Sequence, residues 1–119
     1  MIERFSSASR FEPSVGYSRA LRAGPLVLVA GTTATGPDGE LVGEGNPYLQ
    51  ARQALRNVER ALAEAGAGLA DVVQTRLYVT DIARWEQVGR AHGEVFGEIR
   101  PVTAMVEVSA LIDRECSSR

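Results

Sequence analysis

The sequence predicts an α+β fold whose elements follow the order strand, strand, helix, strand, helix, strand. Two observations support this fold class. Apolar residues recur at helical spacing after Asn46 and again after Asp81, and each stretch ends at a glycine. The segments around these helices have the length and the apolar or alternating pattern of strands, at residues 17–23, 26–30, 72–80 and 102–109.

Length and composition bound the class of protein. A chain of 119 residues fits one domain and is too short for two, so residues 1–119 are expected to form a single domain. One cysteine, Cys116, excludes an internal disulfide framework and favours a reducing cytoplasm. A net charge of −2 supplies no basic surface, and no apolar run approaches the roughly 20 residues of a membrane helix, so neither a nucleic-acid nor a membrane partner is expected.

Both predicted helices carry start and stop signals. Asn46 can cap the first helix, with Pro47 at its first position and Gly66 after its end. Asp81 can cap the second helix, and Gly97 closes it. Two helices of similar size, joined through a strand, are therefore expected.

Residues 26–30 bear on the oligomeric state. All five are apolar and follow the turn residues Gly24 and Pro25, so they are expected to form the second strand of a hairpin, covered on both faces. Two helices can cover only one face of the sheet. The other face is expected to be closed by another subunit, which predicts a homo-oligomer.

The strand that follows Pro101 is the best candidate for a ligand-binding element. Alternation puts one set of residues on a face expected to be dry: Val102, Ala104, Val106 and Val108. The other face is chemically mixed, with Thr103, Met105, Glu107 and Ser109. Because a plain core layer does not need a carboxylate, we expect the mixed face to border a site.

No short motif assigns a chemistry. The glycines after residue 31 lack the Lys-Ser/Thr of a phosphate loop, no Gly-x-Ser-x-Gly occurs, and one His with one Cys cannot hold zinc, so neither a cofactor nor a metal is expected. His92 is either packed on its helix or a catalytic acid or base, and Tyr17 is either a packed aromatic or a proton donor. Arg100 could pair with Glu107, meet an anionic ligand or face solvent.

Several segments in this order resemble the Rid family, also known as YjgF-like or RidA proteins and formerly as L-PSP endoribonucleases. They span nearly the whole chain and are more specific for the fold than for an activity: Gly16-Tyr17-Ser18-Arg19-Ala20, Val29-Ala30-Gly31-Thr32, Gln50-Ala51-Arg52-Gln53-Ala54-Leu55-x-Asn57, Tyr78-Val79-Thr80-Asp81 and Arg100-Pro101-x-Thr103-x-Met105-Val106-Glu107-Val108.

The resemblance implies a chorismate-mutase-like subunit with a mixed sheet on two helices, assembled as a homotrimer with its sheets inward. Active members of the family hydrolyse enamine/imine intermediates, such as 2-iminobutanoate and 2-iminopropanoate, to 2-keto acids and ammonia in a cleft between subunits. Carried over to this chain, that cleft would be lined by Tyr17, Gly31, Thr32, Gly89, His92, Phe96, Thr103 and Met105.

The chain departs from the deaminases at the residues that matter for their chemistry. Thr103 stands where they carry the arginine that grips the substrate carboxylate, Ala30 replaces a serine and Gly89 an asparagine. The family's closing strand, with its glutamate, should follow residue 113, but residues 114–119 have no strand pattern. The final strand is therefore expected to be missing or altered.

Four hypotheses follow. The first is a trimer that binds a small carbonyl, imine or carboxylate metabolite, with its deaminase activity weakened or replaced. The second is an active imine deaminase in which Arg100 or a neighbouring subunit supplies the charge, and the third is a non-enzymatic, chaperone-like module. An endoribonuclease ranks last, because a pI near 5.4 and a single His suit neither RNA binding nor cleavage.

Overall fold

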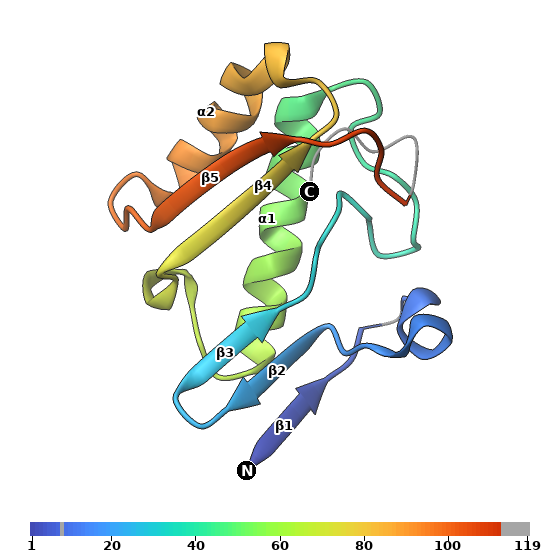
Figure 1. The fold of residues 1–119 in the computed structure, drawn as a ribbon, viewed down its shortest axis with the longest axis vertical. Coiled ribbons are helices and arrows are strands. Elements are labelled where there is room, and N and C mark those ends of the chain that lie inside the picture. The colour runs from blue at the N-terminus through green and yellow to red at the C-terminus, as the bar shows by residue number, and fades with distance from the viewer. Residues whose placement is uncertain (8, 113–119) are drawn as a thin grey trace.

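The computed structural model describes residues 1–7 and 9–112, and it confirms the α+β fold class. Figure 1 shows the elements in chain order. Three short helical turns, η1 (Glu12–Gly16), η2 (Leu69–Asp71) and η3 (Ile82–Arg84), accompany the main elements. These are β1 (Ile2–Phe5), β2 (Ala20–Ala23), β3 (Leu26–Val29), α1 (Pro47–Glu64), β4 (Gln74–Val79), α2 (Trp85–Phe96) and β5 (Val102–Glu107).

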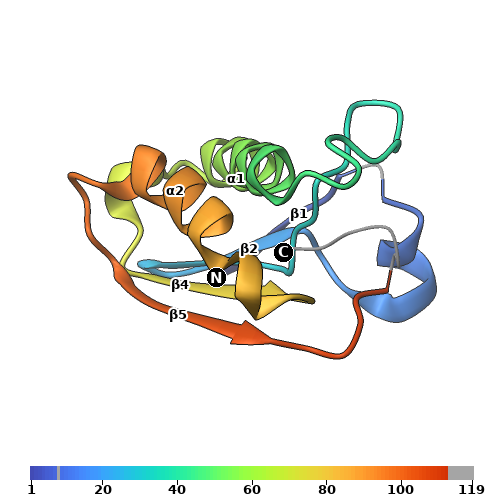
Figure 2. The same cartoon turned by 90° about the horizontal axis from the view of Figure 1, so that it is seen from above.

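The described strands form two sheets. Strands β1, β2 and β3 pair antiparallel in that order, whereas β4 and β5 pair parallel, with α2 as the crossover between them. Figure 2 shows both helices on one side of the strands. The sequence predicted one mixed sheet with an altered closing strand; residues 113–119, on which the latter prediction falls, lie outside the described part of the chain.

The helix signals act much as predicted. Asn46 Oδ1 accepts a hydrogen bond of 3.1 Å from Leu49 N, and Pro47 occupies the first helical position of α1. Gly66, with φ of +81°, follows the end of that helix. Asp81 caps the turn η3, which leads into α2, rather than α2 itself.

The core lies between the helices and the parallel strand pair. Ala51 of α1 and Ala91 of α2 are both buried in this core, and small side chains at a helix contact permit close packing. Tyr48 and Met105 pack against this core at its margin. Its buried members are Ala51, Leu77, Val79, Val88 and Ala91.

The strand faces that turn away from the helices, which we call the open face, are apolar and exposed. Leu26 and Leu28 of β3 are 63% and 60% exposed, and Val102 and Val106 of β5 are 69% and 45% exposed. The alternation predicted for β5 is correct, but the prediction that its apolar face is dry is wrong for the single chain. Helices cover only one side of the strands, so this face has no cover within the described residues.

Gly43 provides a test of the packing that starts α1. Its φ is +78°, and an added Cβ would lie 2.8 Å from Leu49 Cβ, whereas Gly45 has a similar φ of +74° and open space around it. We expect Gly45→Ala to lower the free energy of unfolding by about 1 kcal/mol, from backbone strain alone. Gly43→Ala should cost about 3 kcal/mol, because overpacking is added to the strain.

Urea denaturation of both variants at one protein concentration measures the two costs. Equal costs would show that Leu49 moves aside freely and that the contact is not constrained.

Candidate functional site

Arg19 gathers three of the predicted cleft residues at the end of the β2–β3 hairpin. Its Nη1 donates to Gly31 O at 2.6 Å and to Thr32 Oγ1 at 3.1 Å. Its Nη2 donates to the Tyr17 hydroxyl at 3.3 Å. Because most of its donors already face acceptors of the chain, Arg19 holds Tyr17, Gly31 and Thr32 in place rather than presenting a free charge.

A buried carboxylate supports this first group from behind. Glu12 is only 5% exposed and lies 4.0 Å from Arg19 Nε. It accepts hydrogen bonds from Ser6 Oγ at 2.9 Å, from Ser7 N at 3.1 Å and from Ser7 Oγ. Burial raises the pKa of Glu12, but the hydrogen bonds from Ser7 and Ser6 and the charge of Arg19 together lower it below its ordinary value.

The second group is a chain of hydrogen bonds between α2 and the parallel strands. Thr75 Oγ1 lies 2.9 Å from His92 Nε2 and 2.8 Å from Thr103 Oγ1. Thr103 Oγ1 donates to Pro101 O at 3.1 Å. Because Thr103 has a single hydroxyl proton, it accepts from Thr75, which in turn accepts from His92. The chain therefore places the proton of the ring on Nε2.

His92 is half-buried, and burial lowers the pKa of its imidazole. The ring stacks at a tilt on Phe96, with 4.7 Å between ring centroids. A neutral imidazole near pH 7 with a proton on Nε2 satisfies the hydrogen-bond chain without a charge. In this arrangement His92 orients Thr75 and Thr103, and it reaches Thr103 only through Thr75.

The other predicted residues lie beside these groups rather than in them. Phe96 is 2% exposed and Met105 packs on the core, so both form walls behind the polar chain. A Cβ on Gly89 would meet the ring of Trp85 at 3.6 Å. These three residues define the shape of the second group more than its chemistry.

Arg100 and Glu107 do not pair, so that alternative is wrong. Arg100 precedes the start of β5 and Glu107 is its last residue. Arg100 Nε donates to Gly97 O at 3.0 Å, and Glu107 Oε1 accepts from Ile82 N at 3.0 Å. Glu107 therefore has a structural role at the start of η3. Arg100 is exposed and has a φ of +56°, which is rare for a residue with a Cβ.

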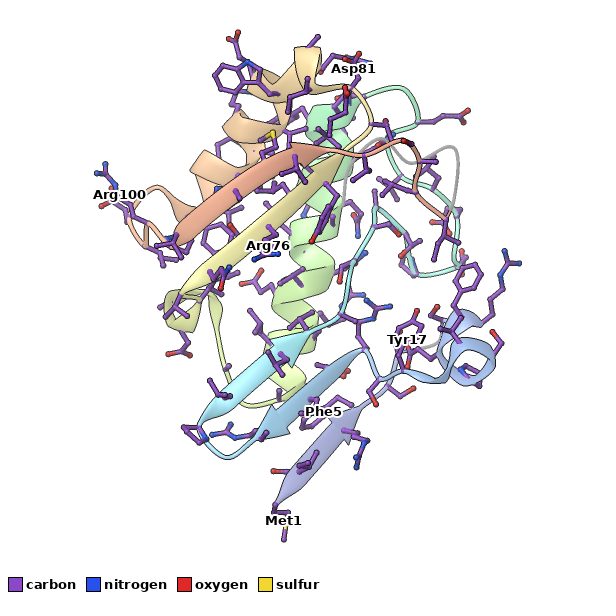
Figure 3. All side chains as sticks on the ribbon, in the orientation of Figure 1. Met1, Phe5, Tyr17, Arg76, Asp81 and Arg100 are labelled. Carbon is purple, nitrogen blue, oxygen red and sulfur yellow. The ribbon has the colours of Figure 1, made fainter. Side chains whose placement is uncertain are left out.

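The two groups lie apart within one chain. Figure 3 places Tyr17 beside η1 and Arg100 beyond the start of β5, on opposite sides of the molecule. Thr103 lies three residues after Arg100, near the same end of β5. The described residues therefore hold the candidate side chains as two separate groups, each of which we call a half-site.

Residues 1–7 and 9–112 contain no group of three His, Cys, Asp or Glu side chains that could hold a metal ion. Among the helices they form, none is both long and apolar enough to cross a membrane.

Comparison with known proteins identifies the family. A family model described as Endoribonuclease L-PSP matches residues 7–116. The crystal structure of Rv2704 from Mycobacterium tuberculosis, a member of the YjgF/YER057c/UK114 family, superimposes with a TM-score of 0.88 at 55% identity, covering 99% of this chain and 93% of that one. The chain belongs to the YjgF/Rid family.

Relatives of known sequence agree with this assignment to the Rid family. A RutC family protein from Pyrococcus abyssi is 36% identical over 101 residues, which is 84% of this chain and 79% of the relative. An uncharacterized protein from Streptomyces coelicolor is 43% identical over 112 residues, covering 94% of this chain and 83% of its own length. The resemblance drawn from the sequence is thus confirmed for the family and the fold.

Sequence reasoning missed three residues of the two half-sites. Thr75 joins His92 to Thr103. The sequence indicated its position only through the alternation of this strand, which puts Thr75 on the same face as Leu77. Arg19 lay within a segment that resembles the family, but only its contacts show it as the centre of the first group. Glu12 lies in a Ser- and Pro-containing segment that gave no signal of burial.

Glu12 should make stability depend on pH. Its lowered pKa in the folded state means that its contribution is complete above the ordinary value of 4.5 and is lost as the pH falls through the folded pKa. Glu12→Gln should therefore lower the free energy of unfolding at pH 7 by about 2 kcal/mol, as expected for hydrogen bonds to a charged group. The difference from the unmodified protein should shrink as the pH falls below 4.5.

Urea denaturation at several pH values measures this difference. Glu59→Gln is the matched control, because Glu59 is an exposed residue of α1. A difference for Glu12→Gln that stays constant from pH 7 to acid pH would contradict the assigned charge.

Proposed function

We propose that this Rid-family protein binds a small carbonyl, imine or carboxylate metabolite in a cleft between the subunits of a homotrimer, and that its imine deaminase activity is weakened. One half of the cleft comes from Tyr17, Gly31 and Thr32 of one subunit. The other half comes from His92, Thr75 and Thr103 of its neighbour.

The observation that carries this proposal is the hydrogen bonding of Thr103. Thr103 stands at the position where the family resemblance calls for an arginine. Its hydroxyl donates its proton to Pro101 O and accepts a hydrogen bond from the Thr75 hydroxyl. A hydroxyl offers one weak hydrogen bond to a carboxylate where a guanidinium offers two charge-assisted ones. Thr103 should therefore orient a substrate carboxylate less firmly than an arginine would.

No described cation of either half-site takes over this task. Arg19 is engaged with Tyr17, Gly31 and Thr32. Arg100 is held by Gly97 O and extends outward beyond the start of β5 (Figure 3). The remaining groups are hydroxyls, a neutral imidazole and the backbone at Gly31, which can bind a carbonyl or imine oxygen or nitrogen by hydrogen bonds alone.

Exposure of the open face supports assembly. Leu26, Leu28, Val102 and Val106 expose apolar surface on the side that the helices leave bare. Apolar surface of this kind is characteristic of contacts between subunits. The proposed cleft needs such an assembly, because a single chain keeps the half-site at Tyr17 apart from the half-site at Thr103.

RNA cleavage receives no comparable support. The chain has one His, whose Nε2 is engaged with Thr75, so it offers no pair of histidines for general acid–base catalysis of RNA cleavage. Its net charge of −2 also gives no electrostatic attraction to a phosphate backbone.

Restoring the charge at position 103 tests the proposal directly. Thr103→Arg should raise the rate of ammonia release from 2-iminobutanoate, generated in situ, by at least about tenfold, because about 1.4 kcal/mol of added transition-state binding has that effect. Thr103→Lys should raise it less, since an ammonium group cannot bind a carboxylate through two parallel hydrogen bonds. Thr103→Val controls for the loss of the hydroxyl.

Rapid ammonia release by the unmodified protein, with no gain in Thr103→Arg, would contradict the proposal. In that case Arg100→Ala identifies whether Arg100 supplies the charge, since its removal would then abolish turnover.

The predicted assembly has its own test. Leu28→Glu places a charge on the open face and should shift the protein to monomers in sedimentation velocity, because an unpaired carboxylate in an apolar contact is costly. Trp85→Glu is the control, since Trp85 is 53% exposed but belongs to α2, on the helix side. An unmodified protein that sediments as a stable monomer would rule out the interfacial cleft.

A further inference from the structure

The open face of β4 and β5 carries a single charged side chain. Arg76 is exposed and makes no hydrogen bond or ion pair with any other described residue. The one carboxylate of these two strands, Glu107, is paired in register with Val79 and so faces the helices. Figure 3 looks onto the open face and shows Arg76 near its middle. The residues that share this face are Gln74, Tyr78, Val102, Ala104 and Val106.

These residues line a hollow of about 240 Å³, which Thr75 and Thr103 border. Ligand pockets for drug-sized molecules measure roughly 300–1,000 Å³, so this hollow suits a smaller molecule. One wall is apolar, formed by Val102, Ala104 and Val106, and Arg76 provides the only charge of the lining. The lining therefore combines one cationic group with an aliphatic surface.

The hollow and the proposed cleft meet at Thr75 and Thr103, but Arg76 belongs to the other face of the strands. Side chains alternate along a strand, so Thr75 and Thr103 point to the helix side, whereas Arg76 and Ala104, one residue further along their strands, point to the open face. Arg76 therefore cannot replace the missing arginine beside Thr103 within the same half-site. Its charge needs a separate explanation.

Assembly makes a partner for the charge of Arg76 more necessary; this argument rests on the proposed homo-oligomer. Covering the open face removes water from Arg76, and a buried charge without a partner is costly. Each copy that turns the same face inward adds its own Arg76. It also adds Arg4 of β1, which is in register with Leu21 and, through Leu21, with Leu28 of the open face. The strand positions on that face contribute no carboxylate. A bound anion would supply the missing counter-charge.

We propose that the hollow around Arg76 binds a short-chain aliphatic carboxylate. The two carboxylate oxygens accept parallel hydrogen bonds from the guanidinium group of Arg76, which has the matching planar geometry. The aliphatic chain lies against Val102, Ala104 and Val106, and Tyr78 completes the lining. The site would respond to the concentration of small acids independently of the cleft.

Titration with butanoate, followed by amide chemical shifts in two-dimensional NMR, tests the site. Saturable shifts should be largest around Tyr78 and Ala104. Butanamide, which has the same shape without the charge, and inorganic phosphate, which has charge without an aliphatic chain, should each bind at least about tenfold more weakly, because each lacks one of the two interactions.

Variants assign the binding to Arg76. Arg76→Gln should weaken butanoate binding by at least about tenfold, and Arg76→Lys should weaken it less, since it keeps the charge without the planar fork. Arg60→Gln, which removes an exposed arginine of α1, should change nothing. Equal butanoate affinity in Arg76→Gln, or equal affinity of the unmodified protein for butanoate and phosphate, would overturn the proposal.

The same titration separates this site from the cleft. Shifts confined to Gly31 and His92, and reduced by Thr103→Val, would place butanoate in the cleft; they would support the proposed function and overturn the site at Arg76. Shifts around Tyr78 that persist in Thr103→Val support the site at Arg76. If sedimentation shows a monomer while these shifts remain, the proposed assembly fails and the site at Arg76 stands.

Discussion

The parallel pairing of β4 with β5 is the constraint on which the rest of the structure depends. The crossover helix α2 returns the chain to the end of the sheet where β4 begins, so β4 and β5 run in the same direction. Their register fixes which residues of the two strands lie side by side. Thr75 meets Thr103 on the helix side, Leu77 meets Met105 in the core, and one residue along, Arg76 meets Ala104 on the open face. A shift of one residue would exchange the two faces and dissolve the hydrogen-bond chain to His92.

The sequence predicted local features well. Alternation after Pro101, the cap at Asn46 and the glycine after α1 depend on neighbours in the chain, and the structure confirms each of them. Register between β4 and β5 depends on segments separated by a whole helix, so the sequence contained no sign that Thr75 and Thr103 are partners. Exposure depends on what covers a strand, and the apolar pattern of residues 102–106 looks the same whether its cover comes from the chain or from another subunit.

The first half-site shows a second reason why residues were missed. Serine, arginine and glutamate in an irregular segment suggest a solvated loop, because these residue types are mostly exposed. The turn η1 instead folds back so that Glu12 is enclosed by Ser6 and Ser7 and faces Arg19. Family membership, which the comparisons establish, accounts for the shared fold. In the proposed function, the side chain at position 103 sets how far the family's chemistry extends to this chain.

The proposed division of the cleft between two chains would have a genetic consequence. With the half at Tyr17 held by Arg19 and the half at Thr103 held by His92, a defect in one half leaves the other intact. In a mixed assembly of two different defective chains, some clefts would receive a sound half from each parent and regain their function. A defective chain that assembles with intact chains would also inactivate a cleft to which an intact chain contributes the other half. A mutation in one gene copy could therefore act dominantly.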